Sequence, residues 1–194
     1  MTEPMSPAAR SPTRRTSARL TVADWVNEAL ELIGEEGLTA VKIDRVAQRL
    51  GATKGSFYWH FTDLASFLDA VASAWCRDRE DMKAMLDALD ELPPRERLIR
   101  LIELVQDTRY WRLERASREW ARTNLRVRHT LARSDGWILE VERKAFSDLG
   151  FSAPEARLRA NALFFAGMGY ILAGPSDGRL DRRQADGLLN LLIG

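Results

Sequence analysis

Apolar residues recur at the spacing of an α-helix along most of this chain, and no segment alternates with the period of two that is typical of a half-buried strand. Glycine, proline and asparagine interrupt the pattern and divide it into separate segments. We therefore predict an all-α fold of about nine helices. The predicted helices cover residues 21–36, 39–50, 54–60, 63–89, 94–109, 111–123, 125–148, 154–173 and 181–193.

The composition is that of a globular protein, with 45% hydrophobic and 29% charged residues among 194. Cys76 is the single cysteine, so an internal disulfide framework is excluded, and a packed thiol is favoured over a redox switch. Residues 1–19 lack the apolar core of a secretory signal. The longest apolar-rich run, 162–174, is shorter than the roughly 18–20 residues that span a bilayer. We expect a cytoplasmic protein with no membrane partner.

The charge distribution separates the amino-terminal part of the chain into three segments. Residues 1–18 are rich in proline, serine, threonine and arginine, which predicts a disordered basic arm. Residues 21–36 hold five acids and no base, whereas residues 42–61 are basic and include Arg45 and Arg49. The two basic segments could form a phosphate-facing surface in the folded chain, but an ordinary solvated surface would have the same pattern. The arm is either a flexible tail or a further contact with DNA.

The segment 42–61 has the construction of a helix-turn-helix. Its first helix has an apolar inward face made of Val46, Ala47 and Leu50. Gly51 can adopt the left-handed conformation that reverses the chain. Phe57 and Phe61 lie four residues apart and can anchor the second helix in the core. A three-helix packing unit without a ligand is the alternative interpretation.

The outer, amino-terminal side of the second helix is polar, which favours DNA as its partner. Thr53 is a good cap, and the free amides after it favour a phosphate oxygen. Lys54 can reach phosphate or guanine, Gly55 allows close backbone approach, and Ser56 can bond to a base edge. The predicted DNA-contacting residues are Lys42, Thr53, Lys54, Gly55, Ser56, Tyr58, His60 and Thr62.

Residues 21–75 resemble the DNA-binding domain of the tetracycline-repressor-like (TetR) family. The matching blocks are Gly37-Leu38-Thr39, Ile43 with Val46-Ala47, Leu50-Gly51-Ala52 and Lys54 to Phe61, the last being similar to the family signature G-x-[LF]-Y-x-[HY]-F. The resemblance implies a homodimer that represses transcription on double-stranded operator DNA and is released by a small-molecule effector. It also implies a helix-turn-helix domain at 19–79 and an effector-binding and dimerisation domain at 80–194.

One position departs from the family pattern. Leu64 stands where the family usually has a lysine that often contacts phosphate. That contact is in question here. Thr62, the amides that begin the fourth helix, or an arginine of the arm in the minor groove could replace it.

By the same resemblance, the carboxy-terminal part would hold an effector pocket between the long helices of residues 63–148. An apolar or aromatic effector would fit the predicted lining, which consists of Trp75, Cys76, Trp111, Trp120, Asn124 and Trp137. Aromatic residues at helical spacing are more often simply core, and this alternative stays open.

The predicted helix 154–173 is apolar around most of its later circumference, and the last helix is rich in leucine. Both suit a two-fold interface between helices, with an intrachain core as the alternative. The predicted interface residues are Leu163, Phe164, Gly167, Tyr170, Ile171, Leu188, Leu189 and Leu192.

Two other functions, an enzyme and a protein-interaction adaptor, are alternatives to a regulator. An enzyme lacks support, because no nucleophile elbow, phosphate loop or metal-ligand spacing occurs and His129 has no neighbouring ligand. We therefore predict no catalytic residue, no metal and no cofactor. A protein-interaction adaptor that has lost DNA binding is favoured only by Leu64. An activator remains an alternative to a repressor.

Overall fold

The computed structural model describes residues 20–174 and 181–194, and every regular element within those ranges is helical. The all-α prediction is thus confirmed. The elements in chain order are α1 (Val22–Glu36), η1 (Leu38–Ala40), α2 (Ile43–Arg49), α3 (Lys54–Tyr58), α4 (Leu64–Ala88), η2 (Leu89–Glu91), α5 (Pro94–Gln106), α6 (Thr108–Trp120), α7 (Leu125–Asp148), α8 (Ala153–Ala173) and α9 (Arg182–Ile193). The predicted arm at 1–18 lies outside the described residues.

Side-chain caps fix most helix starts. Thr21 and Asp24 form a reciprocal capping box at the start of α1, as the sequence predicts. Asn124 accepts a hydrogen bond from the amide of Val127, so α7 begins at the predicted residue. These caps satisfy amides that have no partner inside the helix, which is why local sequence predicts the boundaries well.

Two predicted boundaries are wrong. Residues 39–50 form η1 and α2 rather than one helix, because Val41 and Lys42 are extended and Val41 is buried in the core. The break between α5 and α6 lies at Asp107 rather than at 109–110. The carboxylate of Asp107 accepts a hydrogen bond from the amide of Tyr110 at 2.8 Å, and α6 therefore begins three residues earlier than expected.

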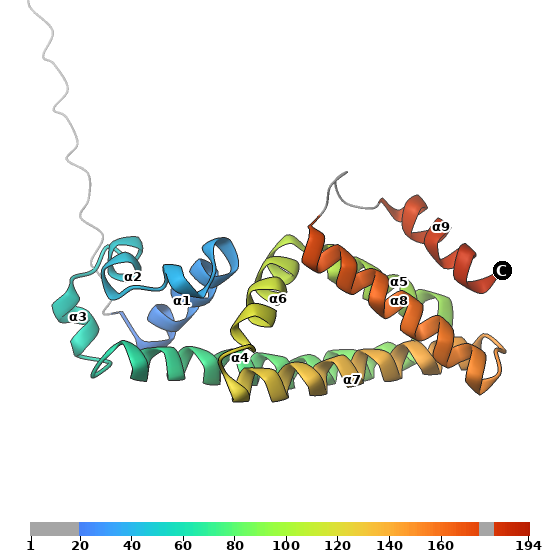
Figure 1. Cartoon of the computed structure of the whole chain (residues 1–194), viewed down its shortest axis with the longest axis horizontal. Coiled ribbons are helices and arrows are strands. Elements are labelled where there is room, and N and C mark those ends of the chain that lie inside the picture. Colours follow the sequence, from blue (N-terminus) through green and yellow to red (C-terminus); the bar gives the residue numbers. More distant parts are fainter. Residues whose placement is uncertain (1–19, 175–180) are drawn as a thin grey trace, which may run out of the picture.

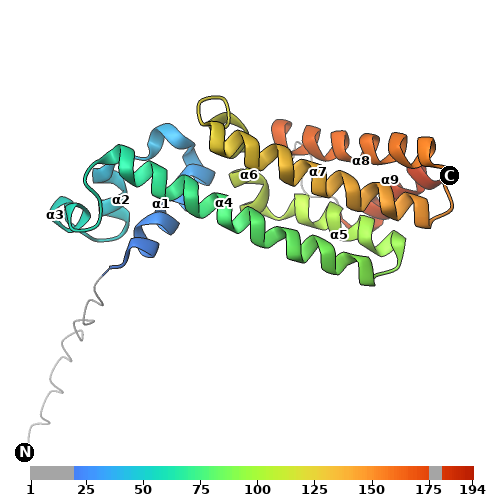
Figure 2. The same cartoon turned by 90° about the horizontal axis from the view of Figure 1, so that it is seen from below.

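The helices form a small head and a longer body (Figure 1). α1, α2 and α3 make up the head, and α4 runs from it into the body beside α7, as Figure 2 also shows. α6 crosses between the head and the group formed by α5, α8 and α9. No described helix is both long enough and apolar enough to cross a membrane.

α4 links the cores of the two parts. Its first half contributes Phe67, Val71 and Trp75 to the core of the head, which also takes residues from α6 and α7. Near its other end, Leu86 packs with Leu101 of α5 and Val141 of α7. Burial of these side chains ties the head to the body through one continuous helix.

Candidate functional site

The turn between α2 and α3 reverses the chain at Gly51, as predicted. The φ angle of Gly51 is 64°, and the amide of Ala52 donates a hydrogen bond to the carbonyl of Ala47 at 2.8 Å. A Cβ atom on Gly51 would meet no atom within 4 Å. Glycine is therefore needed here for its backbone conformation and not for space.

Phe57 fixes the orientation of α3. Its side chain is fully buried, and its ring lies against Trp25, Phe61 and Phe67 at centroid distances of 5.5, 5.2 and 5.3 Å. Thr53 caps the helix by accepting a hydrogen bond from the amide of Ser56 at 3.2 Å. Aromatic contacts on three sides hold the short helix against rotation, so its other face is presented to solvent.

The residues expected to contact DNA lie around this exposed face. Six are exposed, namely Lys42, Thr53, Lys54, Gly55, Tyr58 and Thr62. Ser56 and His60 are half-buried. Trp59, which the sequence-based set omitted, is 78% exposed at the carboxyl end of α3. Its place follows from helical geometry, because residue 59 lies two positions from the buried Phe57 and therefore on the opposite side.

Lys54 is held by an acid of the supporting helix. Its Nζ lies 2.7 Å from Oδ1 of Asp44 in α2, and the two side chains are 62% and 67% exposed. An ion pair this exposed contributes little to stability, so it can open or share the cation when a phosphate arrives.

The arginines of α2 are exposed, but both pair with acids of α1. Arg45 pairs with Glu36, and Arg49 pairs with both Glu28 and Glu35. Hydrogen bonding to Arg49 lowers the pKa of the Glu35 carboxyl, and the same contact raises the pKa of Arg49. The acids of α1 thus compensate the α2 arginines. Three of the four cations of residues 42–61, Arg45, Arg49 and Lys54, are thus paired with acids, which reduces the positive charge that this segment can present to phosphate.

The start of α4 carries a carboxylate. Asp63 accepts a hydrogen bond from the amide of Ser66 at 2.7 Å, and this contact holds the pKa of the Asp63 carboxyl below its ordinary value. Thr62 donates its hydroxyl to Ser66 at 3.1 Å, and Leu64 packs against the core of the head. A carboxylate therefore already caps an amide of this turn, which makes the start of α4 less favourable for a phosphate.

A cavity of about 220 Å³ lies in the body, between α5, α6, α7, α8 and α9. Its walls are almost wholly apolar, and its polar lining groups are Gln106, Tyr110, Glu142 and Tyr170. None of the six residues expected to line the pocket borders this cavity.

The six residues lie elsewhere. Trp75, Cys76 and Trp120 are buried in the core of the head, where the Thr130 hydroxyl donates to the Cys76 sulfur at 3.3 Å. Asn124 caps α7. Trp111 and Trp137 are half-buried and have arginine guanidinium groups over their rings. These positions agree with the alternative that aromatic residues at helical spacing are core.

Most of the residues expected at a dimer interface point into the body instead. Six of the eight line the cavity, namely Leu163, Phe164, Gly167, Tyr170, Ile171 and Leu188. Leu189 is fully buried, and Leu192 is half-buried beside it. Leu163, Ile171 and Leu189 are at most 5% exposed, so these three side chains are already covered by the chain itself.

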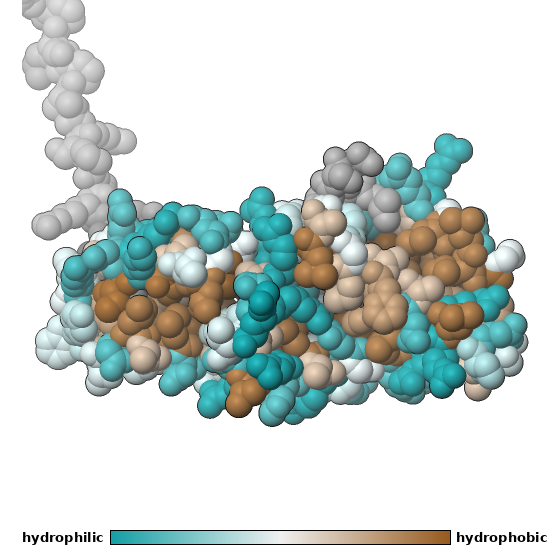
Figure 3. Space-filling view, in the orientation of Figure 1, coloured by the Kyte–Doolittle hydropathy of each residue, from teal (hydrophilic) through white to brown (hydrophobic). Residues whose placement is uncertain are grey.

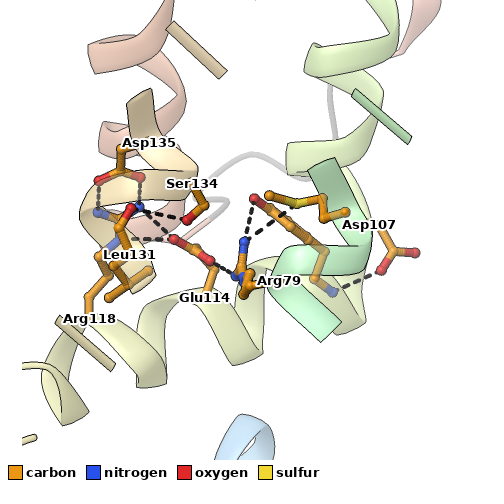
Figure 4. A network of polar contacts seen from close by, with 9 residues as sticks. Arg79, Asp107, Glu114, Arg118, Leu131, Ser134 and Asp135 are labelled. Atoms are coloured by element: carbon orange, nitrogen blue, oxygen red, sulfur yellow. Dashed lines mark hydrogen bonds and ion pairs between the residues drawn. The ribbon is translucent and has the colours of Figure 1, made fainter. Parts of the chain in front are cut away.

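A buried ion network joins α4, α6 and α7 close to the cavity (Figure 4). Glu114 of α6 is 1% exposed and pairs with Arg79 of α4 and with Arg118. Arg118 in turn pairs with Asp135 of α7. Three helices are thereby connected through charges that compensate one another.

The supporting helix, the glycine turn and the exposed second helix together define a helix-turn-helix protein with an all-α body. Residues 26–71 match the family model described as bacterial regulatory proteins, tetR family. The class C tetracycline repressor protein of Escherichia coli is 33% identical over 70 residues, which are 31% of this chain and 32% of that repressor. The chain thus spans about a third of the length of this curated relative.

Solved structures extend the likeness to the fold of the whole chain. A regulator of the TetR/AcrR family from Thermobifida fusca aligns with a TM-score of 0.55 at 19% identity, covering 89% of this chain and 93% of that one. FadR of Bacillus subtilis, solved in complex with stearoyl-CoA, aligns with a TM-score of 0.60 at 16% identity over 90% and 98% of the two chains. In sequence, residues 26–71 are thus similar to the DNA-binding domain of TetR-family regulators, and the chain shares the fold of the solved regulators of that family.

Proposed function

We propose that the chain is a dimeric transcriptional repressor that binds operator DNA through α3 and releases it when a small molecule enters the cavity. The observation that carries the proposal is the way in which α3 packs on the head with one face exposed. Phe57 anchors the helix, while Lys54 and Tyr58 are exposed on it. A short helix presented in this way by a supporting helix suits the major groove.

The roles of the side chains follow from their reach and charge. Lys54 would bind a phosphate or the O6 and N7 atoms of guanine, with Gly55 allowing close approach of the backbone. Tyr58 and His60 would bind phosphates through the polar tips of stiff rings. The carboxylate of Asp63 disfavours a phosphate at the start of α4, where Leu64 also replaces the lysine that is usual in the family. The free energy of DNA binding would therefore depend mainly on α3.

The exposed face of α8 supports a homodimer. Leu158, Phe165 and Leu172 are 68%, 67% and 59% exposed, and their spacing of seven residues places them along one line of the helix. Apolar surface gathers over α8 and α9 in Figure 3, and Leu191 of α9 is 84% exposed. A continuous apolar stripe of this kind is typical of a helix that packs on a second copy. Two heads would then meet successive major grooves about 34–36 Å apart.

For a ligand to release the protein from DNA, the ligand must bind one arrangement of the two heads more tightly than the other. A ligand that binds better to the arrangement unsuited to DNA lowers operator affinity by its differential binding free energy. The cavity borders α6, α7 and α8 in the body. The stearoyl-CoA complex of FadR supports a ligand-binding role for this fold.

The test begins with selection of bound sequences from a random duplex pool, followed by fluorescence anisotropy titrations at several salt concentrations. Lys54→Ala and Tyr58→Ala should each weaken binding by roughly tenfold or more, and Lys54→Ala should also lower the salt slope by about one. Lys83→Ala is the matched control, because Lys83 is also a half-exposed lysine paired with an aspartate, Asp87, but lies on α4. Failure to select any sequence, or variants that bind as the wild type does, would contradict the proposal.

A substitution of Asp44 tests the same assignment through an expected gain in operator affinity. Asp44→Asn would free Lys54 and remove a negative charge beside the duplex. We expect operator affinity to rise and its salt dependence to become steeper. Unchanged affinity would mean that Lys54 does not face the phosphates.

A further inference from the structure

The cavity combines apolar walls with one buried acid. Glu142 of α7 is 3% exposed and lines the cavity, and its Oε2 atom has no hydrogen-bond partner among the described residues. Among the lining side chains that the structure describes, Glu142 is the only charged one. A carboxyl group in these surroundings is costly unless something compensates it.

Glu114 shows how this chain compensates another buried acid. Glu114 is equally buried, but Arg79 and Arg118 both pair with it. No arginine or lysine of the described chain forms an ion pair with Glu142. Burial alone raises the pKa of the Glu142 carboxyl well above its ordinary value. One buried acid is therefore neutralised within the chain, and the other is left facing an open volume.

Aromatic rings complete the surroundings of that volume. Tyr110, Phe164 and Tyr170 line the cavity from α6 and α8. The hydroxyl of Tyr170 is also buried without a hydrogen-bond partner among the described residues. Aromatic faces attract cations through their negative π surfaces, and they pack against the apolar parts of a ligand.

We propose that the cavity binds a small lipophilic organic cation, an amine or quaternary ammonium compound, with Glu142 as its counter-ion. The cationic group would lie at the Glu142 carboxylate and the aromatic rings, and the hydrocarbon part would fill the apolar remainder. A volume of about 220 Å³ is below the roughly 300–1,000 Å³ of sites for drug-sized ligands, so a compact cation with one ring or short alkyl chains fits best. The inference deepens the proposed function, since it names the chemical class of the effector.

A pair of probes that differ only in charge tests the inference. Trimethylphenylammonium and tert-butylbenzene have the same shape, and isothermal calorimetry or thermal-shift titration of the full chain without DNA measures their binding. The wild type should bind the cation at least roughly tenfold more tightly than the neutral compound. Equal affinities, or tighter binding of the neutral compound, would overturn the proposal.

Glu142→Gln keeps the shape of the side chain and removes its charge. It should weaken binding of the cation by roughly tenfold or more while binding of tert-butylbenzene is kept or improved, which also shows that the cavity is intact. Glu140→Gln is the control, because Glu140 lies on the same helix but is 69% exposed and outside the cavity. Undiminished binding of the cation by Glu142→Gln would overturn the assignment.

Release of DNA is measured separately, so the two proposals can fail independently. If the cation binds through Glu142 but leaves operator affinity unchanged, the cavity assignment stands and release by this ligand fails. If the chain selects an operator but binds no cation, the regulator stands and the ligand class is overturned.

Discussion

The hydroxyl of Tyr110 accepts a hydrogen bond from Arg79 at 3.3 Å, while the same tyrosine lines the cavity. The guanidinium of Arg79 also lies 5.1 Å from the centroid of the Tyr110 ring and 5.1 Å from that of Trp75. Arg79 and Trp75 belong to α4, the helix that continues into the head. A ligand in the cavity is therefore one contact away from the helix that positions α3.

Tyr110→Phe tests this relationship, because it keeps the ring in the cavity and removes the hydrogen-bond acceptor. We expect affinity for the ligand to change by less than about threefold, while the ligand-induced loss of operator affinity becomes smaller. Anisotropy titrations of operator DNA with and without ligand measure both quantities. An unchanged ligand effect on DNA binding would show that coupling does not pass through this hydrogen bond.

Removal of Glu114 should destabilise the fold severely. Glu114→Ala would leave the largely buried Arg79 and the partly buried Arg118 without their shared acid. The expected loss in free energy of unfolding is about 3–5 kcal/mol, measured by urea denaturation. Glu119→Ala is the control, because the Glu119 side chain is 76% exposed on the same helix, and it should change stability by less than about 0.5 kcal/mol. A similar small loss for both variants would mean that the network contributes little.

Glu142 should make stability depend on pH. Burial raises its pKa above 4.5 in the folded chain, so the folded state keeps a proton that the unfolded state has already lost. The resulting stabilisation is complete below the unfolded pKa and is lost as the pH rises through the folded pKa. The melting temperature of Glu142→Gln relative to the wild type should therefore increase from acidic to neutral pH.

Differential scanning calorimetry across this range measures the effect. Tyr110 and Tyr170, the other titratable side chains of the described cavity lining, are the same in both proteins. Glu140→Gln should follow the wild type at every pH. A constant difference between Glu142→Gln and the wild type would show that Glu142 has the same pKa in the folded and unfolded chains.

A charge on the exposed face of α8 should prevent dimerisation. Phe165→Glu would place a carboxylate in the middle of the stripe formed by Leu158, Phe165 and Leu172. Sedimentation velocity should show a dimer for the wild type and a monomer for this variant, with operator affinity lowered as well. Leu125→Glu is the matched control, since Leu125 is 62% exposed at the start of α7, and it should remain dimeric. A dimeric Phe165→Glu would place the interface elsewhere.

Local signals in the sequence predicted several features of the head, although not the break in the chain at Val41 and Lys42. The capping box of Thr21 and Asp24 begins α1, Gly51 has the positive φ that the turn requires, and Phe57 is the buried anchor of α3. Each of these depends on a few neighbouring residues, so one sequence can be read for it. The same is true of α7, whose two ends were predicted from Asn124 and Gly150.

The sequence by itself determined that the chain is helical, where most helices begin, and which short helix carries the polar face. Only the tertiary structure decided which faces meet. α8 is apolar on most sides, so its periodicity could not show that Leu163 and Ile171 turn inward and Phe165 outward. The pairing of Arg49 with α1 and the isolation of Glu142 were equally hidden, because both depend on residues far apart in the chain that packing brings together or keeps apart.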